Sequence, residues 1–195
     1  MKKAFCCFSA LLFLCVSPLY AWNAEGHRVV AQIALDYMTP RAKARFQVAH
    51  PRLDNSNFTE AAVWFDTLRD LRIPGLNSMH YVDIPIGFTP FTQLTPKPVH
   101  GLMAYTGARR KLLLGEGTAL EQVIALRILL HVTADLHQPL HAATKDDAGG
   151  NKTRLPRNKT SRNLHTYWDR AGGFLSNRMP LLLRAHVLEK RWPCD

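Results

Sequence analysis

Two histidine–aspartate pairs with the same spacing, His131 with Asp135 and His165 with Asp169, are the clearest chemical signal in this sequence. Residues four apart project from one face of an α-helix, so each pair could present an imidazole and a carboxylate to the same ion. His131 also ends an apolar run, in which an acid is unusual unless it is paired or bound to a metal. Either pair alone could equally be an ordinary surface contact.

Further candidate metal ligands surround these pairs. Pro139 forces the chain out of a helix, so His141 can turn back toward the face of His131 and Asp135. Imidazoles and carboxylates without thiolates suit zinc at a hydrolytic site. At least five histidines and four aspartates exceed what one zinc ion needs, so we expect a multinuclear site. The other candidates are His27, Asp66, His80, Asp83 and His137, each of which could instead have a structural role.

Helices must position these residues, because helical signals dominate the sequence. Thr118 and Glu121 form a capping box before a long apolar stretch, which predicts a helix ending near Gln138. Apolar periodicity predicts a helix over residues 27–37, and Asn57 or Thr59 could cap another that continues to Leu71. We expect one further helix over residues 179–191, an extended segment over 81–86, and irregular structure over 85–98 and 148–162. The predicted fold is mainly α-helical, in a single domain.

The first 21 residues are typical of a secretory signal. Lys2 and Lys3 precede an apolar run over residues 4–16, and Ala21 ends a suitable cleavage region. The run is shorter than the roughly 20 residues that a membrane anchor needs. Cleavage after Ala21 leaves 174 of the 195 residues, enough for one domain (22–195), with Cys194 as the remaining cysteine. We expect a secreted or periplasmic protein without a membrane anchor.

The chain is basic, with a formal net charge of +10 that falls to about +8 without Lys2 and Lys3. This balance suits a polyanionic partner such as nucleic acid, although it could also serve solubility. Residues 148–162 carry five cations. This composition is equally compatible with a solvated loop and with a loop that faces a phosphate. A DNA-binding regulator is disfavoured, because the sequence has no helix-turn-helix or zinc-finger spacing.

Taken together, the motifs resemble the zinc-dependent single-strand-specific nucleases of the S-one/P-one type. The metal site of that family in turn resembles the site of zinc-dependent phospholipase C. The order of the motifs carries the resemblance from Trp22 to about Asp169. They read Trp22-Asn23-Ala24-Glu25-Gly26-His27, Trp64-Phe65-Asp66, His80-Tyr81-Val82-Asp83, His131-Val132-Thr133-Ala134-Asp135-Leu136-His137-Gln138-Pro139-Leu140-His141, Gly149-Gly150-Asn151 and Asn163-Leu164-His165-Thr166-Tyr167-Trp168-Asp169.

The resemblance implies a mainly α-helical fold with three zinc ions. It assigns Asp66, His80, His131 and Asp135 to one zinc, and His141, His165 and Asp169 to a second. A third zinc would take His27, Asp135 and both the free amine and the carbonyl oxygen of Trp22. Asp135 would bridge two ions, and the amine of Trp22 could bind only after the signal is removed.

The resemblance also implies a reaction, in which zinc-activated water attacks the phosphorus of single-stranded DNA or RNA. Asp83 matches a family acid near the attacking water, and Arg69 matches a cation near the phosphate. Tyr81 matches an aromatic that could stack on a base, and Asn151 an asparagine on the substrate side. The expected products are 5′-nucleotides, with 3′-nucleotidase activity in addition, from a monomer without a stable protein partner.

The chain differs from the family at its end, because only 26 residues follow Asp169 and family members usually continue with further helices. The domain is therefore interpreted as truncated at its C-terminus. Two alternatives to a nuclease remain open. One is a phospholipase C-like phosphodiesterase, which would use the same metals. The other is a truncated, inactive protein that binds zinc or nucleic acid without turnover.

Overall fold

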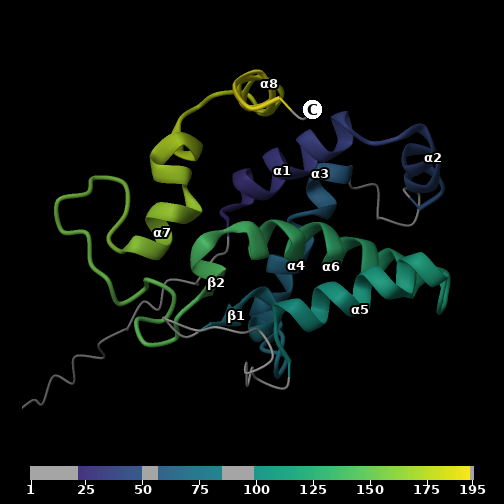
Figure 1. Cartoon of the computed structure of the whole chain (residues 1–195), viewed down its shortest axis with the longest axis horizontal. Coiled ribbons are helices and arrows are strands. Elements are labelled where there is room, and N and C mark those ends of the chain that lie inside the picture. The colour runs from purple at the N-terminus through teal and green to yellow at the C-terminus, as the bar shows by residue number, and fades with distance from the viewer. Residues whose placement is uncertain (1–21, 50–56, 85–98, 194–195) are drawn as a thin grey trace, which may run out of the picture.

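The computed structural model describes residues 22–49, 57–84 and 99–193 and is mainly α-helical, as the sequence predicts (Figure 1). The expected signal at residues 1–21 and the proline-rich segment 85–98 lie outside the described residues. The α-helices are α1 (Ala24–Asp36), α2 (Pro40–Ala49), α3 (Phe58–Ala61), α4 (Trp64–Thr67), α5 (Gly101–Leu114), α6 (Ala119–His137), α7 (Leu164–Asp169) and α8 (Leu181–Arg191). Short 3-10 helices are η2 (Leu68–Leu71), η3 (Asn77–His80), η5 (Pro139–His141) and η6 (Ala171–Ser176).

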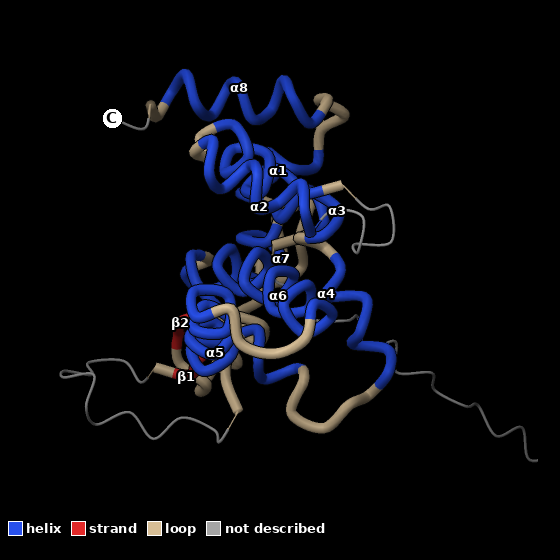
Figure 2. The backbone as a smooth tube through the Cα atoms, turned by 90° about the vertical axis from the view of Figure 1, so that its right-hand side faces the viewer, coloured by secondary structure: helices blue, strands red, loops and turns tan. Residues whose placement is uncertain are grey.

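Helix α6 lies at the centre of the arrangement (Figure 1). Helix α5 packs along it, α1 and α4 also contact it, and α8 packs on α1. The view in Figure 2 shows α8 at the far end of the molecule, beyond α1. The two short strands, β1 (Val82–Asp83) and β2 (Ala142–Ala143), pair in parallel, with Val82 opposite Ala142 and Asp83 opposite Ala143. This pairing joins the segment after His80 to the segment after His141.

Helix α6 begins and ends where its sequence predicts. The Glu121 amide donates to Thr118 Oγ1 at 3.3 Å, and the Thr118 amide donates to the Glu121 carboxylate at 2.7 Å, so the capping box is complete. The helix ends at His137, and Gln138 adopts an extended conformation before Pro139. Val132 of this helix is fully buried and forms a core cluster with Phe65, Leu76 and Ala104.

The prediction of one helix that continues to Leu71 is wrong in one respect, because this range is divided into α3, α4 and η2. Asn57 is the cap, accepting from the Glu60 amide at 2.9 Å. The Asp66 amide donates to Val63 O rather than to Ala62 O, so the Ala62 carbonyl is available to accept from His131 Nδ1 at 2.7 Å. The break in the helix therefore supplies a contact to a candidate metal ligand.

Helix α5 is an element that the sequence analysis did not predict. Its N-cap residue, His100, makes no side-chain capping bond. The helix instead starts where the Gly101 amide donates to Tyr81 O at 2.8 Å, a contact set by the tertiary structure. Because helices without a local cap depend on packing, periodicity alone gave little indication of α5. None of the helices within the described ranges combines the length and apolar character needed to cross a membrane.

Candidate metal centre

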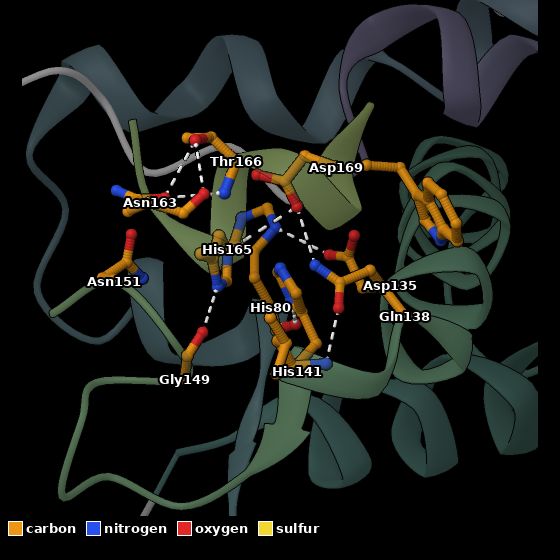
Figure 3. Close-up of polar contacts among 12 residues, drawn as sticks. His80, Asp135, Gln138, His141, Gly149, Asn151, Asn163, His165, Thr166 and Asp169 are labelled. Atoms are coloured by element: carbon orange, nitrogen blue, oxygen red, sulfur yellow. Dashed lines mark hydrogen bonds and ion pairs between the residues drawn. The ribbon is translucent and has the colours of Figure 1, made fainter. Parts of the chain in front are cut away.

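Three groups of buried histidine and aspartate side chains lie close to α6. Figure 3 shows the third group, His141, His165 and Asp169, together with His80 and Asp135. Within each group, one ligand atom from every residue lies within 4.8 Å of the others. The groups draw on helices α1, α4, α6 and α7 and on the 3-10 segments η3 and η5. They consist of His27, Asp66 and His131; of His80, His131 and Asp135; and of His141, His165 and Asp169.

Asp135 connects the first two groups, because its two oxygens face different histidines. Its Oδ1 lies 3.3 Å from His27 Nε2, whereas its Oδ2 lies 3.0 Å from His80 Nδ1 and 3.1 Å from His131 Nε2. Asp66 completes this side, with Oδ1 3.7 Å from His131 Nε2. Asp135 and the three histidines are fully buried. One carboxylate thus lies in contact with ligand atoms of two adjacent groups.

Backbone carbonyls orient three of the imidazoles. His131 Nδ1 donates to Ala62 O, His141 Nδ1 to His80 O and His165 Nδ1 to Gly149 O, each at 2.7 Å. A carbonyl oxygen only accepts, so the proton of each neutral ring must be on Nδ1. The Nε2 lone pairs of His141 and His165 are then available to a metal, which is the arrangement that such outer contacts impose on metal-binding histidines. Burial opposes the charged form of His131, but Asp135 and Asp66 raise its pKa above the ordinary value, so this ring would release a proton on binding a metal.

Several buried atoms of these groups have no hydrogen bond among the described residues, notably His80 Nε2, His141 Nε2 and Asp169 Oδ2. A buried polar atom without a partner is costly, so such atoms call for a ligand. The donors are nitrogen and oxygen only, a set that suits zinc. The three groups could therefore hold metal ions.

The third group depends on Gln138, a fully buried residue that the sequence analysis did not single out. The Leu140 amide donates to Gln138 Oε1 at 2.5 Å, so the side-chain amide must turn its Nε2 toward Asp169 Oδ1, to which it donates at 2.7 Å (Figure 3). Asp169 Oδ2 then remains for a metal. A neutral amide at a helix end offers no metal-ligand signal in a sequence, which explains why Gln138 was missed.

Gly149 also supports the third group, through its carbonyl bond to His165. Its φ of +57° lies in the left-handed region, and a Cβ on this residue would lie 2.5 Å from Leu140 O. Only glycine fits that close approach without a backbone shift. Close packing against the Leu140 carbonyl therefore explains the glycine at position 149 of the Gly149-Gly150-Asn151 motif, which the sequence alone did not reveal.

The two buried aspartates have opposite pKa shifts. Burial alone would raise the pKa of Asp135, but the adjacent histidines, foremost His131, hold it well below its ordinary value. Burial raises the pKa of Asp169 to about 8, against the lowering effect of the Gln138 hydrogen bond. Burial also lowers the pKa of His80 and of His141 to about 4, so both rings are neutral at pH 7 and can bind a metal without losing a proton.

The segment that begins at Trp22 lies against these groups. Trp22 Nε1 donates to Ala134 O at 2.9 Å, and the Asn23 amide donates to Asp169 O at 3.0 Å. Asn23 caps α1 by accepting from the Gly26 amide at 2.9 Å, which positions His27 in the first turns of the helix. A Cβ on Gly26 would lie 2.8 Å from Trp22 Cβ, so glycine allows the tryptophan to pack here.

The other residues singled out in the sequence are Arg69, Tyr81, Asp83, Asn151 and His137. Arg69 Nε pairs with Asp66 Oδ1 at 3.0 Å, which brings a cation beside the first group. Tyr81 and Asp83 are half-buried and flank Val82, so they project from the same face of the strand. Asn151 is half-buried, and its Nδ2 donates to Ala148 O at 2.8 Å. His137 is excluded from the groups, because it is exposed and bonds to Thr133 O at 2.7 Å.

A helical fold that gathers buried imidazoles and carboxylates in three groups could hold metal ions of the kind that hydrolases use. Residues 22–175 match the family model described as S1/P1 Nuclease, and the chain belongs to this family. This match confirms the family resemblance predicted from the motifs.

Curated relatives agree with the family assignment. The chain is 30% identical to Endonuclease 1 of Arabidopsis thaliana over 173 residues, covering 82% of this chain and 57% of the relative. It is 29% identical to Nuclease P1 of Penicillium citrinum, covering 76% and 57% of the two chains. It is 25% identical to Nuclease S1 of Aspergillus oryzae, covering 77% and 54%. The chain thus spans somewhat more than half the length of the curated relatives it matches.

Proposed function

We propose that this protein is a zinc-dependent phosphodiesterase that hydrolyses single-stranded DNA and RNA to 5′-nucleotides, with 3′-nucleotidase activity in addition. The observation that carries the proposal is the convergence of three histidine–aspartate groups with unpartnered inward atoms, in a chain of a nuclease family. The net charge, +10 for the whole chain and about +8 without Lys2 and Lys3, supports a polyanionic substrate.

Three zinc ions are proposed, held by nine residues. Asp66, His80, His131 and Asp135 would hold the first, and His141, His165 and Asp169 the second. Trp22, His27 and Asp135 would hold the third. The separate contacts of Asp135 Oδ1 with His27 and of Oδ2 with His80 and His131 support its bridging role.

Bound zinc would supply Lewis-acid stabilisation of the phosphate and a nucleophile at neutral pH. Around it, Arg69 would add a positive charge beside the scissile phosphate, supported by its contact with Asp66. Asp83 would orient the attacking water and accept its proton. Tyr81 would stack on a base and Asn151 would hydrogen-bond the substrate.

Export is part of the proposal, because Trp22 offers a free amine only after cleavage at Ala21. We propose that residues 1–21 are removed, that the domain 22–195 functions outside the cytoplasm, and that it acts as a monomer. The contacts of Trp22 with Ala134 and of Asn23 with Asp169 support this, since they hold the new N-terminus beside the groups.

The test is nucleotide release from single-stranded DNA by zinc-loaded protein, with and without a chelator. Protein beginning at Trp22 is compared with protein carrying one extra N-terminal residue. We expect chelator-sensitive release that the extension strongly reduces. Folded, zinc-loaded protein without release from DNA or RNA would contradict the nuclease proposal. Release of phosphocholine from lecithin vesicles in its place would indicate a phospholipase C-like enzyme.

A further inference from the structure

A strongly basic segment adjoins the third group of metal-binding residues. Between residues 148 and 168 the sequence contains five cationic side chains and no carboxylate. All five side chains are exposed. They are Lys152, Arg154, Arg157, Lys159 and Arg162. Residues 152–162 are called the basic arm below.

The basic arm has a defined backbone structure. Arg154 and Asn163 form an antiparallel bridge, the Leu155 amide donates to Arg162 O at 2.9 Å, and the Leu164 amide donates to Thr153 O at 2.9 Å. At its tip, Asn158 Oδ1 accepts from the Ser161 amide at 2.8 Å. The arm is therefore a closed, hydrogen-bonded turn, so its cations are presented on an ordered support.

The ends of the basic arm are attached to the candidate metal centre. Gly149, three residues before the arm, accepts from His165 Nδ1, and Asn163 at its end caps α7 by accepting from the Thr166 amide at 2.8 Å. Arg170, just after Asp169, donates to Thr160 O in the arm. The segment between β2 and α7 extends from the left side of the molecule in Figure 1. The arm is therefore joined, through hydrogen bonds at both of its ends, to the elements that carry His165 and Asp169.

Four of the five arm cations form no ion pair with the part of the protein that the structure describes. Among the residues that the structure describes, no ion pair involves Arg154, Arg157, Lys159 or Arg162. Lys152 differs, because it donates to the backbone oxygen of Asp146 at 3.1 Å and its charge helps to lower the pKa of Asp147. Clustered cations of this kind raise the local concentration of a polyanion.

We propose that the basic arm binds the phosphate backbone of a single-stranded nucleic acid beyond the scissile bond, which makes the site prefer long substrates to short ones. This inference rests on the proposed nuclease function. An anionic membrane is the less suitable partner, because Leu155, the arm's one large apolar residue, is half-buried. Surface-binding segments need an apolar face that enters the lipid.

The test replaces three arm cations in the variant R157Q/K159Q/R162Q. The matched control is R41Q/K43Q/R45Q, which removes the same charge from exposed positions of α2, on the opposite side of Figure 1. Both zinc-loaded proteins are assayed on an oligothymidylate of about 20 nucleotides and on a thymidine dinucleotide over a range of salt. Thermal melts check that both variants are folded.

We expect the arm variant to lower the ratio of kcat/KM on the long substrate to that on the dinucleotide by about 10- to 100-fold at low salt. Its log–log dependence on salt should become shallower by about 2, since each phosphate contact on a single strand contributes about 0.7. The control variant should keep the wild-type ratio and slope. Equal losses on both substrates, or an equal effect of the control variant, would refute the proposal.

A binding measurement separates this inference from the nuclease proposal. Anisotropy of the labelled oligothymidylate is followed with chelator-treated protein, in which cleavage is blocked. If the arm variant binds more weakly and with less salt dependence, and the control variant does not, the arm binds the oligonucleotide. This conclusion would hold even if the wild-type protein hydrolysed nothing. Unchanged oligonucleotide binding would overturn it. Loss of binding to phosphatidylserine vesicles with no loss on the oligonucleotide would overturn it in favour of a membrane.

Discussion

The pairs His131–Asp135 and His165–Asp169 share one helical spacing but lie in different surroundings. The first lies in the 19-residue α6, and its carboxylate meets three imidazoles. The second lies in the six-residue α7, with His165 Nε2 and Asp169 Oδ1 3.7 Å apart. Residues of other segments orient this pair, since the Gly149 carbonyl accepts from His165 and the Gln138 amide donates to Asp169.

The surroundings, rather than the spacing, decide the charge of each aspartate. Three histidines hold the pKa of Asp135 well below its ordinary value, whereas burial raises the pKa of Asp169 to about 8. The metal-free protein at pH 7 therefore has an ionised Asp135 and a protonated Asp169. The same motif thus provides an ionised carboxylate among histidines in one place and, in the other, a protonated carboxyl that must release its proton to bind a metal.

The largest expected effect follows from D135N. Because Asp135 contacts ligand atoms of two groups, the variant should lose zinc from both, and hydrolysis should fall at least about 10²- to 10³-fold. Zinc per chain is measured by atomic absorption beside nucleotide release. The variant D169N is the matched control and should lose zinc from one group alone. Equal zinc loss in the two variants would remove the distinction between the pairs.

A smaller effect is expected from Q138L, which removes the amide that orients Asp169. Outer contacts of this kind are worth about 10- to 100-fold in metal affinity or activity. Competition with a zinc chelator should reveal one weakened site, with the sites around Asp135 unchanged. Weakening of every site would mean that Gln138 supports the fold as a whole rather than the second pair.

A third prediction concerns stability and pH without metal. The folded state keeps the Asp169 proton up to about pH 8, whereas the unfolded carboxyl, with its ordinary pKa of 3.8, loses it. The unfolded state binds fewer protons in this range, so Asp169 lowers stability as pH rises. With chelator present, the Tm of D169N relative to that of the wild type should therefore rise between pH 5 and pH 8, by at least about 2–4 °C.

The variant D135N should behave in the opposite way in the same melts. The depressed pKa of Asp135 contributes stability above the ordinary carboxyl pKa, which is lost as pH falls through the folded value. Removing the charge therefore destabilises the protein at neutral pH. If both variants moved Tm in the same direction across the range, the contrast between the aspartates would be wrong.

The smallest effect is expected from H137A, two residues beyond Asp135. His137 is exposed and bonds only a carbonyl of its own helix, Thr133 O, among the described residues. Stability should change by no more than about 0.5 kcal/mol, with zinc content unchanged. H141A provides the contrast, since it removes a ligand of the third group. Zinc loss in H137A would bring His137 into the site.

Much of the fold near α6 could be predicted, because its signals are local. Thr118 and Glu121 define where the helix begins, and Pro139 defines where it ends. Helix α5 could not be predicted in this way, since its start depends on the Tyr81 carbonyl rather than on a capping side chain. The division between α3 and α4 was missed for a similar reason. It satisfies His131, a residue about 70 positions away in the chain.

The sequence by itself determined the family, the mainly helical class and the histidines and aspartates from which a metal centre could be built. Residue type and helical spacing are properties of short segments, and motif order preserves them. Only the tertiary structure decided that Gln138 and Gly149 hold the third group, and that Asp135 and Asp169 have opposite pKa shifts. Burial and the proximity of distant residues cause these features, and neither is recorded in a local pattern.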